Sequence, residues 1–208
     1  MKRIQYYLKF IFCIAALFLL TNYNNNFYNP KNADGIATNH SINNSDNIKF
    51  TNLLRSMYEW YETKGIKSMD FDVYSKDSLY AGIDSIALRN RLTELQHTDF
   101  FSQDFLNNYK KIAQEIDNQL KHGTMKFYKG DLPPYGSEAN PWCNCQDNPD
   151  NYWKIIETKN IKINGNSASL SWTWGGNFLY RVKLKREHTA WKISYLEGFD
   201  FNSFFYIK

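Results

Sequence analysis

The chain has 208 residues, of which 43% are hydrophobic and 17% aromatic, enough to bury the core of one sizeable globular domain without cross-links. Its formal net charge of +4 includes three basic residues within the first 22 positions, Lys2, Arg3 and Lys9, and no acidic residue lies there. The remainder carries 22 basic against 21 acidic residues, and this near-neutrality removes the electrostatic argument for nucleic-acid binding.

The first residues have the pattern of an export signal. Lys2 and Arg3 precede an unbroken apolar run of 11 residues, Phe10 to Leu20, which is the length of a signal-peptide core and short for a membrane span. We therefore expect residues 1–21 to direct export to the periplasm or cell envelope. No small-x-small cleavage triplet follows Leu20, so an uncleaved membrane anchor stays open, as the one expected membrane contact.

The segment 22–47 contains ten Asn residues and few large aliphatic ones. Such a composition buries too little apolar surface to offset the entropy of ordering the chain. We expect a disordered tether here, followed by a single domain over 48–208.

A helix is predicted from about Asn47 to Gly65. Its apolar side chains recur at intervals of three and four residues, which places them on one helical face: Phe50, Leu53, Leu54, Met57, Trp60 and Tyr61. The two aromatic residues at its end either fill the core or line a ligand pocket beside the sheet.

Two further helices are predicted downstream. Residues 69–84 fit a short strand or a loop, and 86–95 has Leu residues at helical spacing. A stronger helical pattern runs from about Ser102 to Gly123.

A long irregular segment, 123–151, contains Cys143 and Cys145. In an exported protein the pair favours a disulfide across one residue, while a metal site and two free thiols remain alternatives. No good set of further metal ligands accompanies the pair, and the Asp-rich stretch 147–151 lacks the EF-hand spacing. We expect no metal and no cofactor.

Four antiparallel strands are predicted over 152–163, 167–174, 178–185 and 191–195. Asn164-Gly165 and Gly175-Gly176 mark the turns. Alternation assigns an inward face to Ala168, Leu170, Trp172, Trp174, Phe178, Tyr180, Val182, Leu184, Trp191, Ile193 and Tyr195. Arg181, Lys183 and Lys185 form a basic stripe on the outward face, which favours a solvated surface over an acidic partner or a membrane.

Three short motifs carry a family resemblance: Tyr58-x-Trp60-Tyr61 on the first helix, Pro141…Gln146-Asp147 before the sheet, and Trp191-Lys192-Ile193 in the last strand. Over about 49–195, the chain resembles an uncharacterised branch of exported bacterial proteins in the nuclear-transport-factor-two-like superfamily. The resemblance implies an α+β fold in which N-terminal helices pack on a curved four-stranded antiparallel sheet, the cystatin-like cone. The superfamily includes binders, isomerases, dehydratases and dimerisation modules, so the fold does not decide the function.

The inward sheet positions carry no Asp, Glu or His, which argues against acid–base chemistry on the sheet. We therefore expect a non-enzymatic exported domain that binds a small apolar ligand or a partner protein through an aromatic-lined cone. The candidate ligand-binding residues are Trp60, Tyr61, Trp172, Trp174, Tyr180, Gln146 and Asp147.

Two alternatives stay open. One is an isomerase- or dehydratase-type enzyme with Asp147 or His188 as the base, with Asp70 and Asp72 also able to enter the cone from loops. The other is an interaction module, such as an immunity or envelope-assembly partner or a homodimer. Outward apolar residues on the sheet would support it, and strand three offers only Leu179.

Overall fold

The structure is a computed structural model that describes residues 44–65, 70–131, 136 and 139–205. All of them belong to one compact unit, His40–Lys208. The expected leader 1–21 and most of the expected tether 22–47 lie outside the described residues. Within the described ranges, no helix is both long and apolar enough to cross a membrane.

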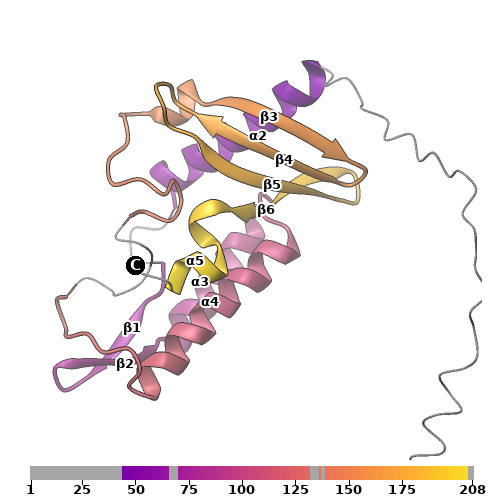
Figure 1. The fold of residues 1–208 in the computed structure, drawn as a ribbon. Coiled ribbons are helices and arrows are strands. Elements are labelled where there is room, and N and C mark those ends of the chain that lie inside the picture. The colour runs from indigo at the N-terminus through magenta and orange to yellow at the C-terminus, as the bar shows by residue number, and fades with distance from the viewer. Residues whose placement is uncertain (1–43, 66–69, 132–135, 137–138, 206–208) are drawn as a thin grey trace, which may run out of the picture. The chain divides into compact units, whose positions relative to one another are not determined.

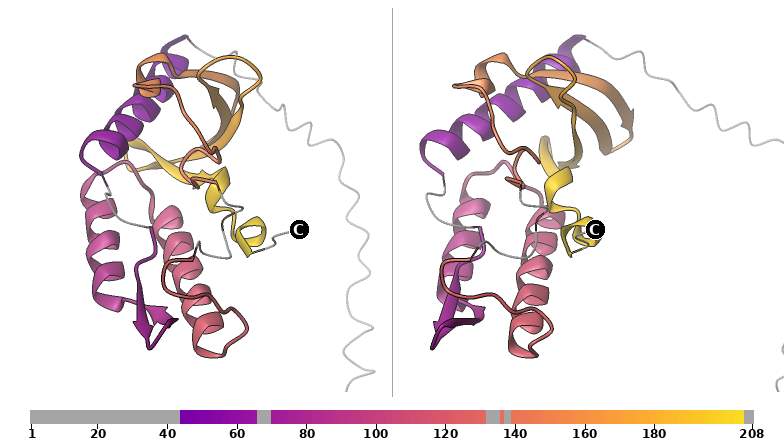
Figure 2. Two further views of the ribbon diagram at one scale, coloured as in Figure 1. Left: turned by 90° about the vertical axis from the view of Figure 1, so that its left-hand side faces the viewer. Right: turned by 60° about the vertical axis from the view of Figure 1, so that its left-hand side comes forward.

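The four strands near the C-terminus form one antiparallel meander in the order β3-β4-β5-β6. The first helix, α2 (Asn44–Thr63), lies against one face of this sheet (Figures 1 and 2). The strand bounds are β3 Glu157–Asn164, β4 Ser167–Thr173, β5 Tyr180–Glu187 and β6 Ala190–Leu196. The predicted α+β class with a four-stranded antiparallel sheet is confirmed.

The middle of the chain forms a hairpin and two helices. Strands β1 (Val73–Lys76) and β2 (Leu79–Ile83) pair with each other, which resolves the ambiguous stretch 69–84. Helices α3 (Ser85–His97) and α4 (Gln103–Lys121) follow, and the side chains of Asp84 and Ser102 cap their first backbone N–H groups. The chain closes with two short helical turns, η3 (Glu197–Phe199) and α5 (Phe201–Phe205).

The α3–α4 connection is joined to the edge of the sheet. Ile193 in β6 donates its backbone N–H to Phe100 at 2.8 Å and accepts from Ser102 at 2.9 Å. This short parallel bridge continues the hydrogen bonding beyond β6 and protects an otherwise open sheet edge. It also brings the aromatic residues of the connection beside the end of α2.

The first predicted strand begins too early. Residues Tyr152–Ile155 form a 3-10 turn, η2, and extended pairing starts only at Glu157. Tyr152 and Ile156 are fully buried. The strand prediction follows the apolar content of this stretch, but the 3-10 turn, and not strand pairing, directs these side chains into the core.

Tyr195 was predicted to face inward, and this prediction is wrong. Lys183 pairs with Tyr195 and Leu184 pairs with Ile193, so Ser194 is an extra residue in β6. A β-bulge of this kind reverses the alternation of the residues that follow it. Leu196 is therefore fully buried, while Tyr195 lies outward with Lys183 4.9 Å above its ring.

Strand β5 begins at Tyr180, two residues after the predicted start, and β4 ends at Thr173. Trp174 and Phe178 stack face to face across the turn, with ring centroids 3.7 Å apart. Leu179 beside them is 53% exposed. The aromatic pair therefore closes the end of the sheet by packing across the turn and not by strand pairing.

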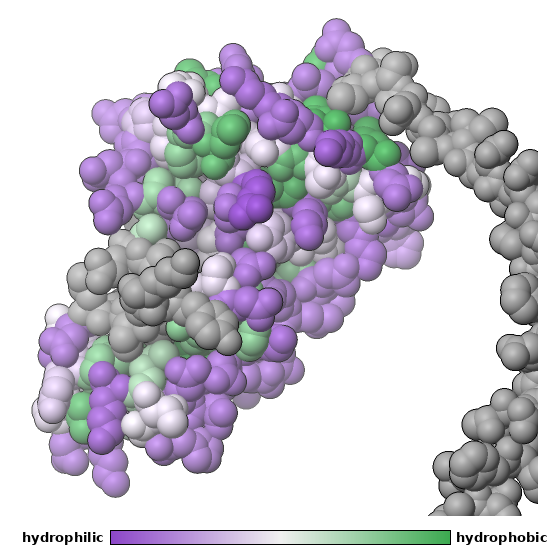
Figure 3. All heavy atoms as spheres, in the orientation of Figure 1, coloured by the Kyte–Doolittle hydropathy of each residue, from purple (hydrophilic) through white to green (hydrophobic). Residues whose placement is uncertain are grey.

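The outward basic stripe is largely compensated by acidic residues of the same chain. Arg181 pairs with Glu197 at 2.7 Å, Lys185 with Asp104 at 2.7 Å, and Lys192, on the neighbouring strand, with Asp99 at 2.6 Å. Figure 3 shows this side of the molecule, where hydrophilic residues are interspersed with smaller apolar areas. The arrangement favours the solvated-surface interpretation of the stripe.

Candidate functional site

The aromatic residues that line the inner face of the sheet are used in internal contacts. Trp172 is fully buried, and its indole N–H donates to the hydroxyl of Tyr58 at 3.1 Å. Tyr58 in turn donates to the carbonyl of Trp142 at 2.6 Å. Burial raises the pKa of Tyr58 well above its usual value, so the phenol remains a hydrogen-bond donor.

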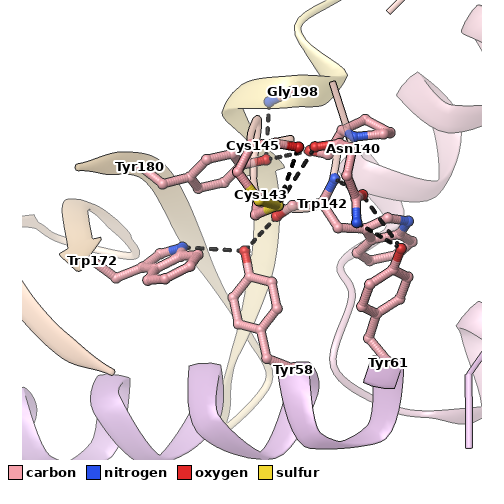
Figure 4. Close-up of a disulfide and its surroundings, with 10 residues drawn as sticks. Tyr58, Tyr61, Asn140, Trp142, Cys143, Cys145, Trp172, Tyr180 and Gly198 are labelled. Carbon is pink, nitrogen blue, oxygen red and sulfur yellow. Dashed lines mark hydrogen bonds between the residues drawn. A yellow bond between two sulfur atoms is a disulfide. The ribbon is translucent and has the colours of Figure 1, made fainter. Parts of the chain in front are cut away.

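Tyr180 forms a second such link. It is 1% exposed, donates to the carbonyl of Pro141 at 2.7 Å, and accepts from the backbone N–H of Gly198 at 2.9 Å. Burial raises the pKa of Tyr180 well above its usual value. Figure 4 shows Tyr58 and Tyr180 converging from α2 and β5 on the loop segment that precedes the sheet.

Trp142 follows the Pro141 carbonyl and supplies the second carbonyl to which these tyrosines donate. Its side chain is fully buried, stacks on Tyr61 with centroids 4.7 Å apart, and meets Phe199 edge-on at 5.1 Å. The space between the first helix and the sheet, expected to hold a ligand, is filled by direct packing of Tyr58 on Trp172, with ring centroids 4.8 Å apart. The Trp142 ring packs beside it, at the end of α2.

A disulfide between Cys143 and Cys145 follows Trp142 directly. The Cα atoms are 5.1 Å apart, within the ordinary range for disulfides. Asn144 between them has a φ of 51°, and the backbone N–H of Asn140 donates to Cys145 at 2.9 Å. Asn tolerates this left-handed conformation, so the turn closes tightly after Trp142.

Asp70 enters the interior from the segment after α2. Its carboxylate accepts from the indole N–H of Trp142 at 2.9 Å, and the Tyr109 hydroxyl donates to its backbone carbonyl. Burial raises the pKa of Asp70 to about 6, while the Trp142 hydrogen bond and nearby Arg91 oppose the rise. This carboxylate was one of three acids considered able to enter from a loop.

The other expected site residues are dispersed. The Tyr61 hydroxyl accepts from Asn140 at 3.2 Å, and Trp174 is partly buried in its stack with Phe178. Gln146 and Asp147 are exposed on the loop. The structure brings Trp60 and Tyr61 beside Trp142 but does not assemble the seven expected residues into one pocket.

The two residues considered as catalytic bases are not in the interior. Asp147 is exposed, and exposed His188 lies in the β5–β6 turn with a φ of 54°. A base has to reach its substrate within hydrogen-bonding distance. Neither residue is placed to act inside the space between α2 and the sheet.

A groove lies instead between the second half of α2 and α3, with a volume of about 850 Å³. The two helices follow one another along the same side of the molecule (Figure 2). Trp60 and Phe100, both partly exposed, line it with ring centroids 6.2 Å apart. The other lining residues are polar: Ser56, Glu59, Thr63, Lys64, Asn90, Thr93, Glu94, His97 and Thr98.

Sequence reasoning identified only Trp60 among the residues of this groove. The wall from α3 was missed because helix prediction follows the apolar face, and Asn90, Thr93, Glu94 and His97 lie on the polar one. Their spacing of three and four residues was the available signal. It shows which side chains share a face but not which helix they will oppose.

No group of three or more His, Cys, Asp and Glu side chains suited to a metal ion occurs among the residues that the structure describes. Comparisons of the chain with protein-family models, with curated proteins and with solved structures found no match. The geometry of the groove therefore carries the functional argument.

Proposed function

We propose that this chain is an exported domain that binds a small ligand in the groove between α2 and α3. The observation that carries the proposal is a partly exposed Trp60 in a concavity of about 850 Å³. Ligand sites are typically concavities of this size, with aromatic surface and a few polar groups that fix orientation. Trp60 gives the ligand a flat apolar face on which to pack.

Binding, and not acid–base catalysis, fits the chemistry of the interior better. Asp70 has a shifted pKa, which by itself is typical of functional groups. However, its carboxylate accepts from Trp142, and its backbone carbonyl accepts from Tyr109. We assign Asp70 to the structural core that holds the Trp142 loop.

Export is the second part of the proposal. A disulfide persists in oxidising compartments, and the Cys143–Cys145 bond supports placement in the periplasm or cell envelope. The apolar run Phe10 to Leu20 would supply the signal, with the uncleaved anchor as the alternative. Sequencing the N-terminus of the protein recovered from the envelope fraction distinguishes a cleaved leader from an anchor.

The finer fold assignment is also proposed. The cone of the nuclear-transport-factor-two-like superfamily has a first helix against a meander of antiparallel strands, as α2 and β3–β6 have here. Under this assignment, the space that a ligand would take in the cone is occupied by the packed side chains of Tyr58 and Trp172. The proposed ligand site therefore moves to the outer side of the α2 end.

Titration with the apolar fluorophore 1-anilinonaphthalene-8-sulfonate tests the location of the site. The wild type should bind the probe, and Trp60→Ala should weaken binding at least fivefold because it removes the groove's aromatic surface. Trp174→Ala is the matched control, since Trp174 is also partly exposed but lies outside the groove. Loss of binding in Trp174→Ala with full binding in Trp60→Ala would place the site at the end of the sheet.

A further inference from the structure

The two walls of the groove are single helical faces. Ser56, Glu59 and Thr63 on α2 are spaced three and four residues apart, and so are Asn90, Thr93 and His97 on α3. Side chains at these intervals lie above one another along a helix. Each wall is therefore a row of hydrogen-bonding groups facing the same space.

Most of these groups have no partner among the residues that the structure describes. Among the described residues, the side chains of Ser56, Glu59, Asn90, Thr93 and His97 make no hydrogen bond or ion pair. Together they offer hydroxyl, carboxylate, amide and imidazole groups, which donate and accept from both sides. A ligand that fills the groove therefore needs many closely spaced polar groups that can both donate and accept hydrogen bonds.

The aromatic surface imposes a second requirement on the ligand. Trp60 and Phe100 present partly exposed rings whose planes are tilted by 54°. An aromatic face in water favours a flat apolar partner. A pyranose ring meets both requirements, because its C–H groups form an apolar face and its hydroxyls project from the rim.

Charge narrows the class of ligand further. Glu94 is compensated by Arg91, whose guanidinium lies 3.1 Å from its carboxylate. Glu59 and Lys64 carry opposite charges on the other wall. Among the described residues that line the groove, no excess of one sign remains to attract a phosphate or a carboxylate.

We propose that the groove holds a neutral saccharide, with one sugar ring stacked on Trp60 and its hydroxyls hydrogen-bonded to the polar rows of α2 and α3. This inference rests on the proposed function and adds the chemical class of the ligand. The volume of about 850 Å³ lies in the upper part of the range for small-molecule sites, as an oligosaccharide requires.

The test is isothermal titration of the full chain with maltotriose, cellotriose and tri-N-acetylchitotriose, and with trigalacturonate as the acidic counterpart. At least one neutral sugar should bind, and more tightly than trigalacturonate. Trp60→Ala should weaken binding more than tenfold. Thr93→Val keeps the shape of the side chain but removes a hydroxyl, so about a two- to tenfold loss is expected.

Thr189→Val is the matched control, because Thr189 is exposed in the β5–β6 turn, away from the groove, and should leave binding unchanged. Unchanged circular dichroism establishes that each variant is folded. If the fluorophore binds at Trp60 but no neutral sugar does, or if trigalacturonate binds best, the saccharide inference is wrong and the proposed function stands. If neither the fluorophore nor any sugar depends on Trp60, both are wrong.

Discussion

The indole N–H of Trp142 donates to the carboxylate of Asp70 across 72 positions of sequence, at 2.9 Å. This contact joins the loop before the sheet to the segment after α2. Tyr109 of α4 donates to the same aspartate. Three parts of the chain therefore meet at one partly buried acid, and its charge state affects the stability of the whole unit.

Stability should rise as the pH falls through the pKa of Asp70. That pKa is raised by burial from 3.8 to about 6, so the folded state binds the proton more tightly than the unfolded state. The resulting stabilisation is fully present below pH 3.8 and is lost as the pH rises through 6. Between pH 7.5 and 5, this group should add about 1 kcal/mol to the free energy of unfolding.

Asp70→Asn isolates this contribution, because the amide keeps an acceptor for Trp142 but does not titrate. Urea unfolding at both pH values should give a smaller rise for the variant than for the wild type. Exposed Asp147→Asn serves as the control and should behave as the wild type does. Equal pH dependence in all three proteins would show that Asp70 does not titrate in this range.

Reduction of the Cys143–Cys145 disulfide should destabilise the protein moderately. The bond closes a ring of only three residues, so the loss of unfolded-state entropy that it provides is small, about 1–2 kcal/mol. Urea unfolding with and without a phosphine reductant measures the difference. The double variant Cys143→Ala, Cys145→Ala is the control and should not respond to the reductant. A loss above about 4 kcal/mol would indicate that the bond does more than close this ring.

Gly198→Ala should be strongly destabilising for steric reasons. A Cβ on Gly198 would collide with the carbonyl oxygen of Pro141 and lie 2.6 Å from its carbonyl carbon. These are backbone atoms, and Tyr180 holds both segments, so neither can move aside easily. We expect a loss of at least about 2–3 kcal/mol in the free energy of unfolding.

Gly130→Ala is the matched comparison for Gly198. It has a φ of 101° but open space around the new Cβ, so only the backbone conformation is disfavoured and about 1 kcal/mol is expected. Denaturant unfolding measures the loss of unfolding free energy in each variant. The difference between them separates the steric contribution at Gly198 from the backbone-conformation contribution at Gly130. A smaller effect at Gly198 than at Gly130 would mean that the contact with Pro141 is loose.

The sequence was sufficient to predict the three long helices and the four-stranded meander, but not the long-range contacts between them. Strong turn signals at Asn164-Gly165 and Gly175-Gly176 defined the meander, and apolar spacing located α2, α3 and α4. Trp142 was a different case, because an isolated apolar residue in an irregular loop gives no periodic signal. Its burial depends on partners such as Asp70 that are distant in sequence.

The groove was half predictable for a similar reason. Trp60 was identified because it lies on the apolar face of α2, whereas Thr93 lies on the polar face of α3, which sequence patterns leave to solvent. The bulge in β6 has no recognisable sequence signal either. Ser194 is an ordinary strand residue, and only the pairing of β6 with β5 reveals it as an extra one.

The bulge can be tested by comparing two neighbouring residues. With uninterrupted alternation Tyr195 would face the core and Leu196 the solvent, but the structure places Leu196 at 0% exposure and Tyr195 on the outer face. Leu196→Ala should therefore cost about 2–5 kcal/mol of unfolding free energy through lost burial and the cavity left behind. Tyr195→Ala removes a partly exposed ring with a 3.4 Å hydrogen bond to Asp200 and a contact with Lys183, so about 1 kcal/mol is expected.

Ile193→Ala provides the reference, because Ile193 faces inward in either register and is fully buried. Urea unfolding of the three variants under one condition should place Leu196→Ala with Ile193→Ala, and Tyr195→Ala near the wild type. The reverse order, with Tyr195→Ala as costly as Ile193→Ala, would show that β6 runs without the bulge. In that register Leu196 would leave the core and Tyr195 would lose its contact with Lys183, so the ranking of the two variants reports directly on strand pairing.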